Sequence, residues 1–197
     1  MGRVDADPAV PDRRPATVAE ARALAHPVRL RILRLLGETD LTNRELADVL
    51  GRDPATVLHH LRQLVAAGFV EPLDVRRGRR NARERPYRST GRSWWLSAPE
   101  EETPAGPLSE GQRGATAALA ALRDELDDAG GDAVVGMARF VLHLSPTDLA
   151  RLDAELLEVL DRWQLGDAER RDQPAYGGFV LLHELRPGVG PGSPAPD

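Results

Sequence analysis

Apolar side chains recur every three or four residues in four consecutive segments between residues 17 and 68. This spacing predicts four amphipathic helices. The first and third helices are expected to open with capping boxes, Thr17–Glu20 and Thr42–Glu45, and Gly37 and Gly51 are expected to end the second and third. The pattern places the helices at residues 17–26, 28–36, 42–50 and 53–67.

The third and fourth predicted helices are separated only by Gly51 and Arg52, which is typical of a helix-turn-helix. The fourth helix has Asp53 as its N-cap and Pro54 at its first position. Two further segments, residues 69–75 and 85–90, have the composition of short strands on either side of an arginine-rich loop. Together these elements predict a winged helix-turn-helix domain over residues 17–96.

One side of the fourth helix is polar, carries short side chains and has no acidic residue, as a surface that contacts base edges requires. The residues expected to contact bases are Ala55, Thr56, His59, His60 and Gln63. His59 and His60 are neighbours in the chain and diverge by about 100° around the helix, so they do not suit a shared metal ion. His59 is the better candidate for a base contact, whereas His60 is expected at a phosphate or at the edge of the core.

The charge distribution separates the chain into two halves of opposite sign. Residues 1–96 contain 18 Arg and 12 acidic residues, whereas residues 97–197 contain 8 Arg and 19 acidic residues. A basic half joined to an acidic half indicates that the first half binds nucleic acid. The residues expected to contact the DNA backbone or to form the wing are Arg29, Asn43, Arg44, Arg62, Arg76, Arg77, Arg79, Arg80, Arg83 and Arg85. A solvated, functionless arginine loop is the alternative interpretation of the wing.

Four stretches of residues 18–92 resemble the ArsR-type winged-helix repressors. They are ALAHPVRLRIL at 23–33, ELA at 45–47, TVLHHLRQL at 56–64 and AGFV at 67–70. The resemblance implies a winged-helix fold that binds duplex DNA. Thr56, His59 and His60 match the family's recognition helix, whereas Leu58 stands where a serine is usual. The thiolate and His/Asp metal sites of the family have no counterpart here, so we expect no metal and no cofactor.

The second half is expected to form a smaller module over residues 110–186. A linker at 97–109 precedes a helix over 110–129, a strand over 137–144, a helix that starts at 145–148 and extends through Trp163, and a strand over 179–185. The arm at 1–16 and the tail at 187–197 are expected to be disordered. The predicted fold class is therefore α+β, a winged helix-turn-helix followed by a small helix-strand-helix-strand module.

A module of about 75 residues is small for an independent core, so we expect it to pair with a second copy of the chain. Dimerisation would place two recognition helices about one DNA turn, roughly 34 Å, apart. The candidates for a dimer contact or a small-molecule pocket are Leu119, Leu122, Leu126, Trp94, Trp95 and Trp163. The sequence does not decide whether the module also binds a small-molecule effector. His143 and His183 are expected to be structural residues.

Composition narrows the classes of function. The chain has no cysteine, which excludes disulfides and thiolate chemistry. It contains no catalytic motif at a usable spacing and no apolar segment long enough for export or for a membrane span. We therefore expect a cytoplasmic, non-enzymatic, homodimeric DNA-binding transcriptional regulator. The alternative is a winged-helix module that binds an acidic protein and has only non-specific affinity for DNA.

Overall fold

The computed structural model describes residues 13–77, 83–97, 109–138 and 140–184. The helices are α1 (Val18–Leu24), α2 (Pro27–Glu38), α3 (Asn43–Leu50), α4 (Pro54–Ala66), α5 (Glu110–Ala129) and α6 (Pro146–Leu165), with short 3-10 helices η2 (Arg92–Trp95) and η3 (Asp167–Arg170). The strands are β1 (Arg14–Pro15), β2 (Leu41–Thr42), β3 (Val70–Pro72), β4 (Arg76–Arg77), β5 (Arg83–Glu84), β6 (Pro86–Ser89) and β7 (Leu96–Ser97). No helix in these ranges is both long and apolar enough to cross a lipid bilayer.

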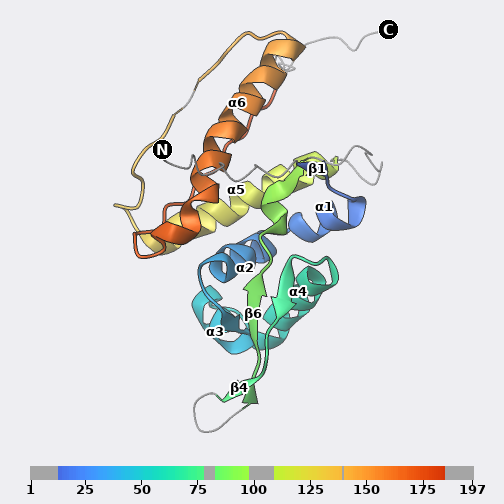
Figure 1. The fold of residues 1–197 in the computed structure, drawn as a ribbon, viewed down its shortest axis with the longest axis vertical. Coiled ribbons are helices and arrows are strands. Elements are labelled where there is room, and N and C mark those ends of the chain that lie inside the picture. Colours follow the sequence, from blue (N-terminus) through green and yellow to red (C-terminus); the bar gives the residue numbers. More distant parts are fainter. Residues whose placement is uncertain (1–12, 78–82, 98–108, 139, 185–197) are drawn as a thin grey trace, which may run out of the picture.

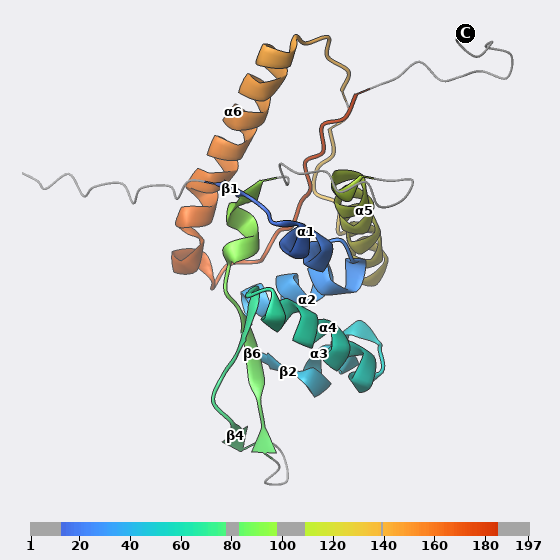
Figure 2. The same ribbon diagram turned by 90° about the vertical axis from the view of Figure 1, so that its right-hand side faces the viewer.

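The N-terminal half is a helix-turn-helix with a small β-sheet beside it. Strands β2, β6 and β3 form an antiparallel sheet in that order, and Val70 lies opposite Ser89. Strands β4 and β5 continue the same hairpin as a two-stranded antiparallel ribbon. In both views this ribbon extends to the end of the molecule opposite α6 (Figures 1 and 2). The predicted wing strands are thus present.

The predicted helix caps explain where α1, α3 and α4 begin and where α3 ends. Thr17 and Thr42 each form a complete capping box, and Asp53 accepts hydrogen bonds from the first backbone amides of α4. Gly51 ends α3 in the left-handed conformation at φ +60°, which glycine adopts without a steric penalty. Gly37, in contrast, does not end α2, which continues to Glu38. A glycine inside a helix costs only about 1 kcal/mol relative to alanine, which the burial of neighbouring leucines outweighs.

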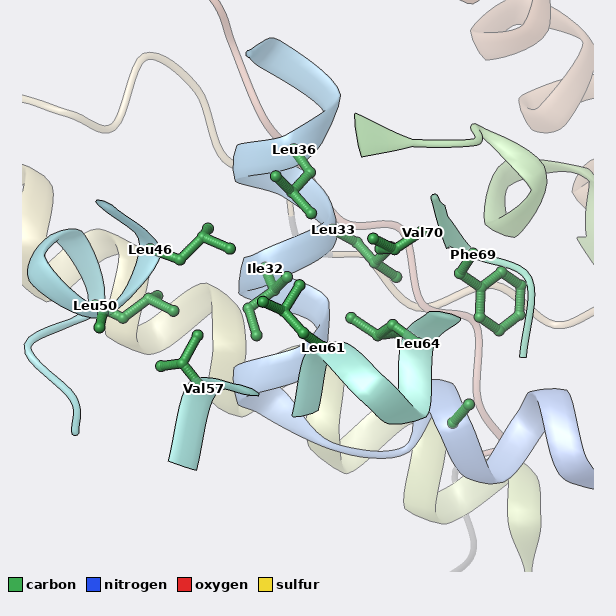
Figure 3. Close-up of a cluster of buried hydrophobic side chains, with 12 residues drawn as sticks. Ile32, Leu33, Leu36, Leu46, Leu50, Val57, Leu61, Leu64, Phe69 and Val70 are labelled. Atoms are coloured by element: carbon green, nitrogen blue, oxygen red, sulfur yellow. The ribbon is translucent and has the colours of Figure 1, made fainter. Parts of the chain in front are cut away.

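The core of this half is a single cluster of apolar side chains contributed mainly by α2, α3 and α4 (Figure 3). Ile32, Leu46, Val57, Leu61 and Leu64 are fully buried within it. Phe69, just before β3, and Val70, its first residue, complete the cluster on the side of the sheet. On α4 the buried residues Val57, Leu61 and Leu64 recur every three or four positions, so α4 is held against the core along one side and leaves its opposite side exposed.

Helix α5 packs directly against α1 and α2, although the sequence indicated that it belonged to a separate module. Its buried side carries small residues, Ala117 and Ala121, which allow the helices to approach closely. Residues 13–16, expected in the N-terminal arm, also join this half. Strand β1 pairs in parallel with β7, and Ala16 donates a backbone hydrogen bond to Ser97.

The predicted C-terminal strands are absent from the described residues, so the expectation of a helix-strand-helix-strand module is wrong. Residues 137–138, 140–144 and 179–184 adopt no regular structure, and Met137 is 91% exposed. A strand needs a partner that satisfies its backbone groups and a layer that covers its apolar side. The alternating apolar pattern at 137–144 has neither within this part of the chain, because α6 is the element that follows and it leaves its own apolar residues exposed.

Candidate nucleic-acid interface

Helices α3 and α4 are joined by a short turn that the surrounding hydrogen bonds hold in place. The Asn43 side-chain amide donates to the backbone carbonyl of Pro54 at 3.0 Å, which ties the start of α3 to the first turn of α4. Asp53 Oδ1 accepts from the amides of Ala55 and Thr56 at 2.8 and 3.3 Å. Asn43 therefore positions α4, and its amide nitrogen is engaged within the protein rather than exposed for a phosphate.

Four of the five residues predicted to contact bases lie on the exposed side of α4. Ala55, Thr56, His59 and Gln63 are exposed there, opposite the buried Val57. The structure thus brings these four residues to one side of α4, the recognition surface, and α4 itself contains no acidic residue. Such a surface suits the electronegative major groove of duplex DNA.

His60, the fifth predicted contact, is buried instead. Its ring lies 4.4 Å from the ring of His26, the N-cap of α2, and its Nδ1 atom has no hydrogen-bond partner in the described residues. One step around a helix is enough to turn a side chain from the surface to the interior. His60 therefore belongs to the junction between α2 and α4, and the expectation of a base contact does not agree with its position.

The environment of these two histidines disfavours their charged forms. Burial lowers the pKa of His60 to about 4, and repulsion between its charged form and the positive charge of Arg29, or of His26 when that ring is protonated, acts in the same direction. Burial also lowers the pKa of His26, with a further contribution from Arg29. His26 Nδ1 accepts the backbone N–H of Val28 at 3.2 Å, a hydrogen bond that only the unprotonated nitrogen makes. Both histidines are therefore neutral in the folded protein near pH 7.

These pKa shifts predict that the fold loses stability in mild acid. The unfolded chain binds protons at His60 with a pKa near 6.5, above the folded value of about 4. The contribution of the neutral histidines to the free energy of unfolding is therefore fully present above pH 6.5. As the pH falls from 6.5 to 5, the free energy of unfolding decreases by about 2 kcal/mol. Urea unfolding at a series of pH values measures this change.

Two variants test whether the loss of stability in mild acid comes from the buried ring of His60. His60→Leu is expected to remove most of the pH dependence, whereas His143→Gln, at an exposed histidine, should leave it unchanged. Glu20, whose pKa Arg14 holds near 2, responds only below its unfolded value of 4.5 and does not contribute in this window. Equal stability of the wild-type protein at pH 5 and pH 7 would contradict the interpretation.

Arg29, expected to contact a phosphate, is also buried and bonds inside the protein. Its guanidinium donates to the backbone carbonyls of Ala23 and Arg22 and to the side-chain oxygen of Gln63. It thus connects the end of α1 to the exposed side of α4. Its position disagrees with the expected phosphate contact, because the helical period that predicts exposure ignores the neighbouring α1.

Along the wing, the ribbon formed by β4 and β5, the balance of charge changes from one cross-strand pair to the next. At its base Arg76 lies opposite Glu84 and bonds to Glu45 at 3.2 Å, so its charge is compensated. One residue further along the ribbon, Arg77 lies opposite Arg83. Arg77, Arg83 and the exposed Arg85 have no acidic partner in the described residues. Arg79 and Arg80, also predicted for the wing, lie outside the described residues.

The base of the wing is fixed by an ion pair that the sequence analysis did not identify. Arg88 on β6 contacts Asp40, just before β2, through two hydrogen bonds of 2.6 and 2.8 Å. This contact holds the pKa of Asp40 below its usual range. Because the two residues are 48 positions apart in the sequence, they come together only when β2 pairs with β6. Arg44 and Arg62 remain exposed beside the recognition surface.

The aromatic residues predicted for a dimer contact or a pocket do not gather in one place. Trp94 donates from its indole N–H to the buried Asp161 of α6 at 2.8 Å, and Arg13 lies over the rings of Trp94 and Trp95. Trp163 is 67% exposed and lies under Arg170. Trp94 and Arg13, which also bonds to Asp161, therefore attach α6 to the N-terminal half.

A hollow of about 310 Å³ lies between α5 and the turn of the helix-turn-helix. It is lined by Arg31, Leu50, Gly51, Arg52, Asp124, Asp127 and Asp128. Small-molecule sites are usually apolar with a few polar groups, whereas this lining is mostly charged. No cluster of three or more potential metal-binding side chains occurs in the described ranges.

Comparison with known proteins agrees with this architecture for part of the chain. A search of curated proteins finds no match. A family model described as a helix-turn-helix domain matches residues 24–72, from the end of α1 to the end of β3. This family is related to the ArsR-type regulators, which are typically not enzymes. Residues 24–72 are therefore a helix-turn-helix domain, a type of domain that points to DNA as the partner.

Proposed function

We propose that this protein is a transcriptional regulator that binds specific duplex DNA as a homodimer. In this proposal α4 enters the major groove, where Ala55, Thr56 and His59 contact base edges. The wing lies along the minor groove or the adjacent backbone. The observation that carries the proposal is the combination of an acid-free, exposed side of α4 with a neighbouring ribbon in which Arg77 and Arg83 have no acidic partner among the described residues.

The pairing of Arg77 with Arg83 supports an anionic partner for the wing. Like charges directly opposite each other on neighbouring strands destabilise a sheet. A phosphate between the two guanidinium groups removes this repulsion and accepts hydrogen bonds from both. The backbone of DNA supplies phosphates along the whole length of such a ribbon, and neutralising them releases counterions, which favours binding.

Further contacts to the backbone are proposed at the edges of α3 and α4. Arg44 lies in the first turn of α3 and Arg62 on the exposed side of α4. Next to Arg44, the free amides and the positive end of the dipole at the N-terminus of α3 also attract phosphates. These contacts set the orientation of the domain on the duplex, and the side chains in the groove provide the sequence preference.

The proposed homodimer rests on the apolar surface that the second half leaves exposed. Because α5 packs on α1 and α2 through its alanines, its Leu119 and Leu126 remain 48% and 40% exposed on another side. Helix α6 adds Leu149, Val159, Leu160 and Trp163 to the exposed apolar residues. Exposed apolar side chains on a helix are often covered by a partner subunit. We propose that Leu119, Leu122 and Leu126 contact a second copy.

The oligomeric state tests this interface. The wild-type protein is expected to sediment as a dimer at micromolar concentration, and Leu119→Glu combined with Leu126→Glu is expected to be monomeric, because each substitution buries a charge in the dimer. Val49→Glu, at an exposed apolar residue of α3, is the matched control and should remain dimeric. A monomeric wild-type protein would contradict the proposed interface.

Selection of DNA fragments tests the proposed function. Fragments retained by the protein from a random duplex pool are expected to share a sequence that binds at least about a thousandfold more tightly than bulk DNA. Replacing Thr56 and His59 together with Ala should remove this preference and leave the affinity for bulk DNA nearly unchanged. The control Thr116→Ala with His143→Ala changes exposed residues of the same types elsewhere. Equal affinity for all duplexes would instead indicate a protein-interaction module.

A further inference from the structure

Arg29 holds an unusual position for a residue so close to the recognition surface. It lies in the first turn of α2 and is buried, and its Nε and Nη2 atoms donate to the carbonyls of Ala23 and Arg22 at the end of α1. The Nη2 bond measures 2.6 Å. Because the guanidinium is planar, these bonds also fix the direction of its remaining N–H groups.

One of those remaining groups orients Gln63 on α4. Arg29 Nη1 lies 2.6 Å from Gln63 Oε1. A guanidinium has only donors, so it can bond only to the oxygen of the side-chain amide. The amide nitrogen of Gln63 must therefore point away from Arg29. The chemistry of the two groups settles an orientation that is otherwise hard to assign for glutamine.

The oriented amide in turn determines which nitrogen of His59 carries the proton. Gln63 Nε2 lies 3.2 Å from His59 Nε2, one turn earlier on the same helix. An amide nitrogen only donates, so His59 Nε2 must accept and is unprotonated. The neutral ring then carries its proton on Nδ1, which makes no hydrogen bond to any other described residue.

We propose that Arg29 is a specificity-determining positioning residue, which acts through Gln63 to hold His59 as the neutral Nδ1–H tautomer. Held in this way, His59 offers a donor to the major groove and selects acceptor atoms there. Those acceptors are guanine O6 and N7, adenine N7 and thymine O4. Gln63, whose amide is engaged on both sides, supports this contact and does not itself provide the preference.

The tautomer can be measured without DNA, so this test is independent of the proposed function. Nitrogen-detected NMR spectra of the isotope-labelled full-length protein distinguish protonated from unprotonated imidazole nitrogens for each of the five histidines. Near neutral pH we expect His59 to show a proton on Nδ1 and none on Nε2. A proton on Nε2 in the wild-type protein would overturn the proposal.

Gln63→Glu is the sharpest variant, because a carboxylate still accepts from Arg29 but has no N–H for His59. His59 Nε2 is then expected to gain a proton and donate to the carboxylate. Gln164→Glu, at an exposed residue of α6, introduces the same charge elsewhere and should leave the His59 signals unchanged. An unprotonated His59 Nε2 in Gln63→Glu would contradict the assigned hydrogen bond.

Arg29→Lys tests the first step. Lysine retains the charge but lacks the planar fork, so Gln63 is expected to lose its fixed orientation and His59 to populate both tautomers. Thermal unfolding shows whether this variant folds, and Gln63→Glu decides the proposal if it does not. A folded Arg29→Lys protein with an unchanged His59 spectrum would show that Arg29 does not position the ring.

The contribution to specificity rests on the proposed function and has its own measurement. In selections from random duplexes, His59→Ala identifies the base position that His59 contacts. At that position Gln63→Leu, which frees the ring, is expected to lower discrimination by about tenfold. Undiminished discrimination would overturn the role in specificity. If no common sequence is selected even by the wild-type protein, the proposed function and this role fail, whereas the tautomer is decided separately by NMR.

Discussion

Replacing Arg77, Arg83 and Arg85 with glutamine is expected to weaken binding to the selected duplex by roughly 500-fold per subunit at about 0.1 M salt, if each arginine neutralises one phosphate. The three side chains are exposed and have no acidic partner in the described residues. Each neutralised phosphate contributes about 0.9 to the slope of log affinity against log salt, so the variant should also lower that slope by about 3. Fluorescence anisotropy over a salt series measures both quantities.

The salt slope separates the wing from a general effect of charge. Replacing Arg123 on α5 and Arg151 and Arg162 on α6 with glutamine changes the net charge of the protein by the same amount as the wing variant. This control is expected to keep the wild-type slope, because screened charges far from the phosphates release no bound counterions. If both triple variants lose affinity to the same extent, long-range attraction explains the result and the wing makes no direct contact.

Replacing Leu61 with Ala is expected to lower the free energy of unfolding by about 3 kcal/mol. Leu61 is fully buried in the cluster that joins α2, α3 and α4, so its truncation leaves a cavity in the element that supports the recognition surface. A loss of this size is a large part of the total stability of a typical domain. Urea unfolding followed by circular dichroism measures the change.

Leu58 provides the matched comparison on the same helix. It is only partly buried and lies outside the cluster, so Leu58→Ala should cost about 1 kcal/mol or less. The difference between the two variants isolates the effect of burial, because the residue type and the helix are the same. Similar losses for both would mean that α4 does not pack against the core through Leu61.

The expected loss of DNA affinity and the expected loss of stability concern two different functions of α4, binding and packing. The core holds one side of α4, and in the proposed function the exposed side and the wing together bind DNA. Asn43 and Asp53 fix the first turn of α4, whereas Arg29 reaches its exposed side from α2. We therefore expect binding and stability to depend largely on separate sets of residues, so that variants can change one without the other.

Local features of the domain follow from the sequence by itself. The capping boxes at Thr17 and Thr42, the Asp53 cap and the terminal Gly51 depend on hydrogen bonds between residues a few positions apart. Such interactions need no tertiary context, and they place the helices to within a few residues. The acid-free side of α4 and the run of arginines in the wing are likewise properties of the chain alone.

Only the tertiary structure decided which of these residues are exposed. His60 and Arg29 are buried because neighbouring helices cover them, and a single helix's period does not contain that information. The hydrogen bonds from Arg29 to Gln63 and from Gln63 to His59 likewise require α2 and α4 to lie against each other. The predicted C-terminal strands did not form because a strand depends on partners elsewhere, whereas a helix satisfies its own backbone.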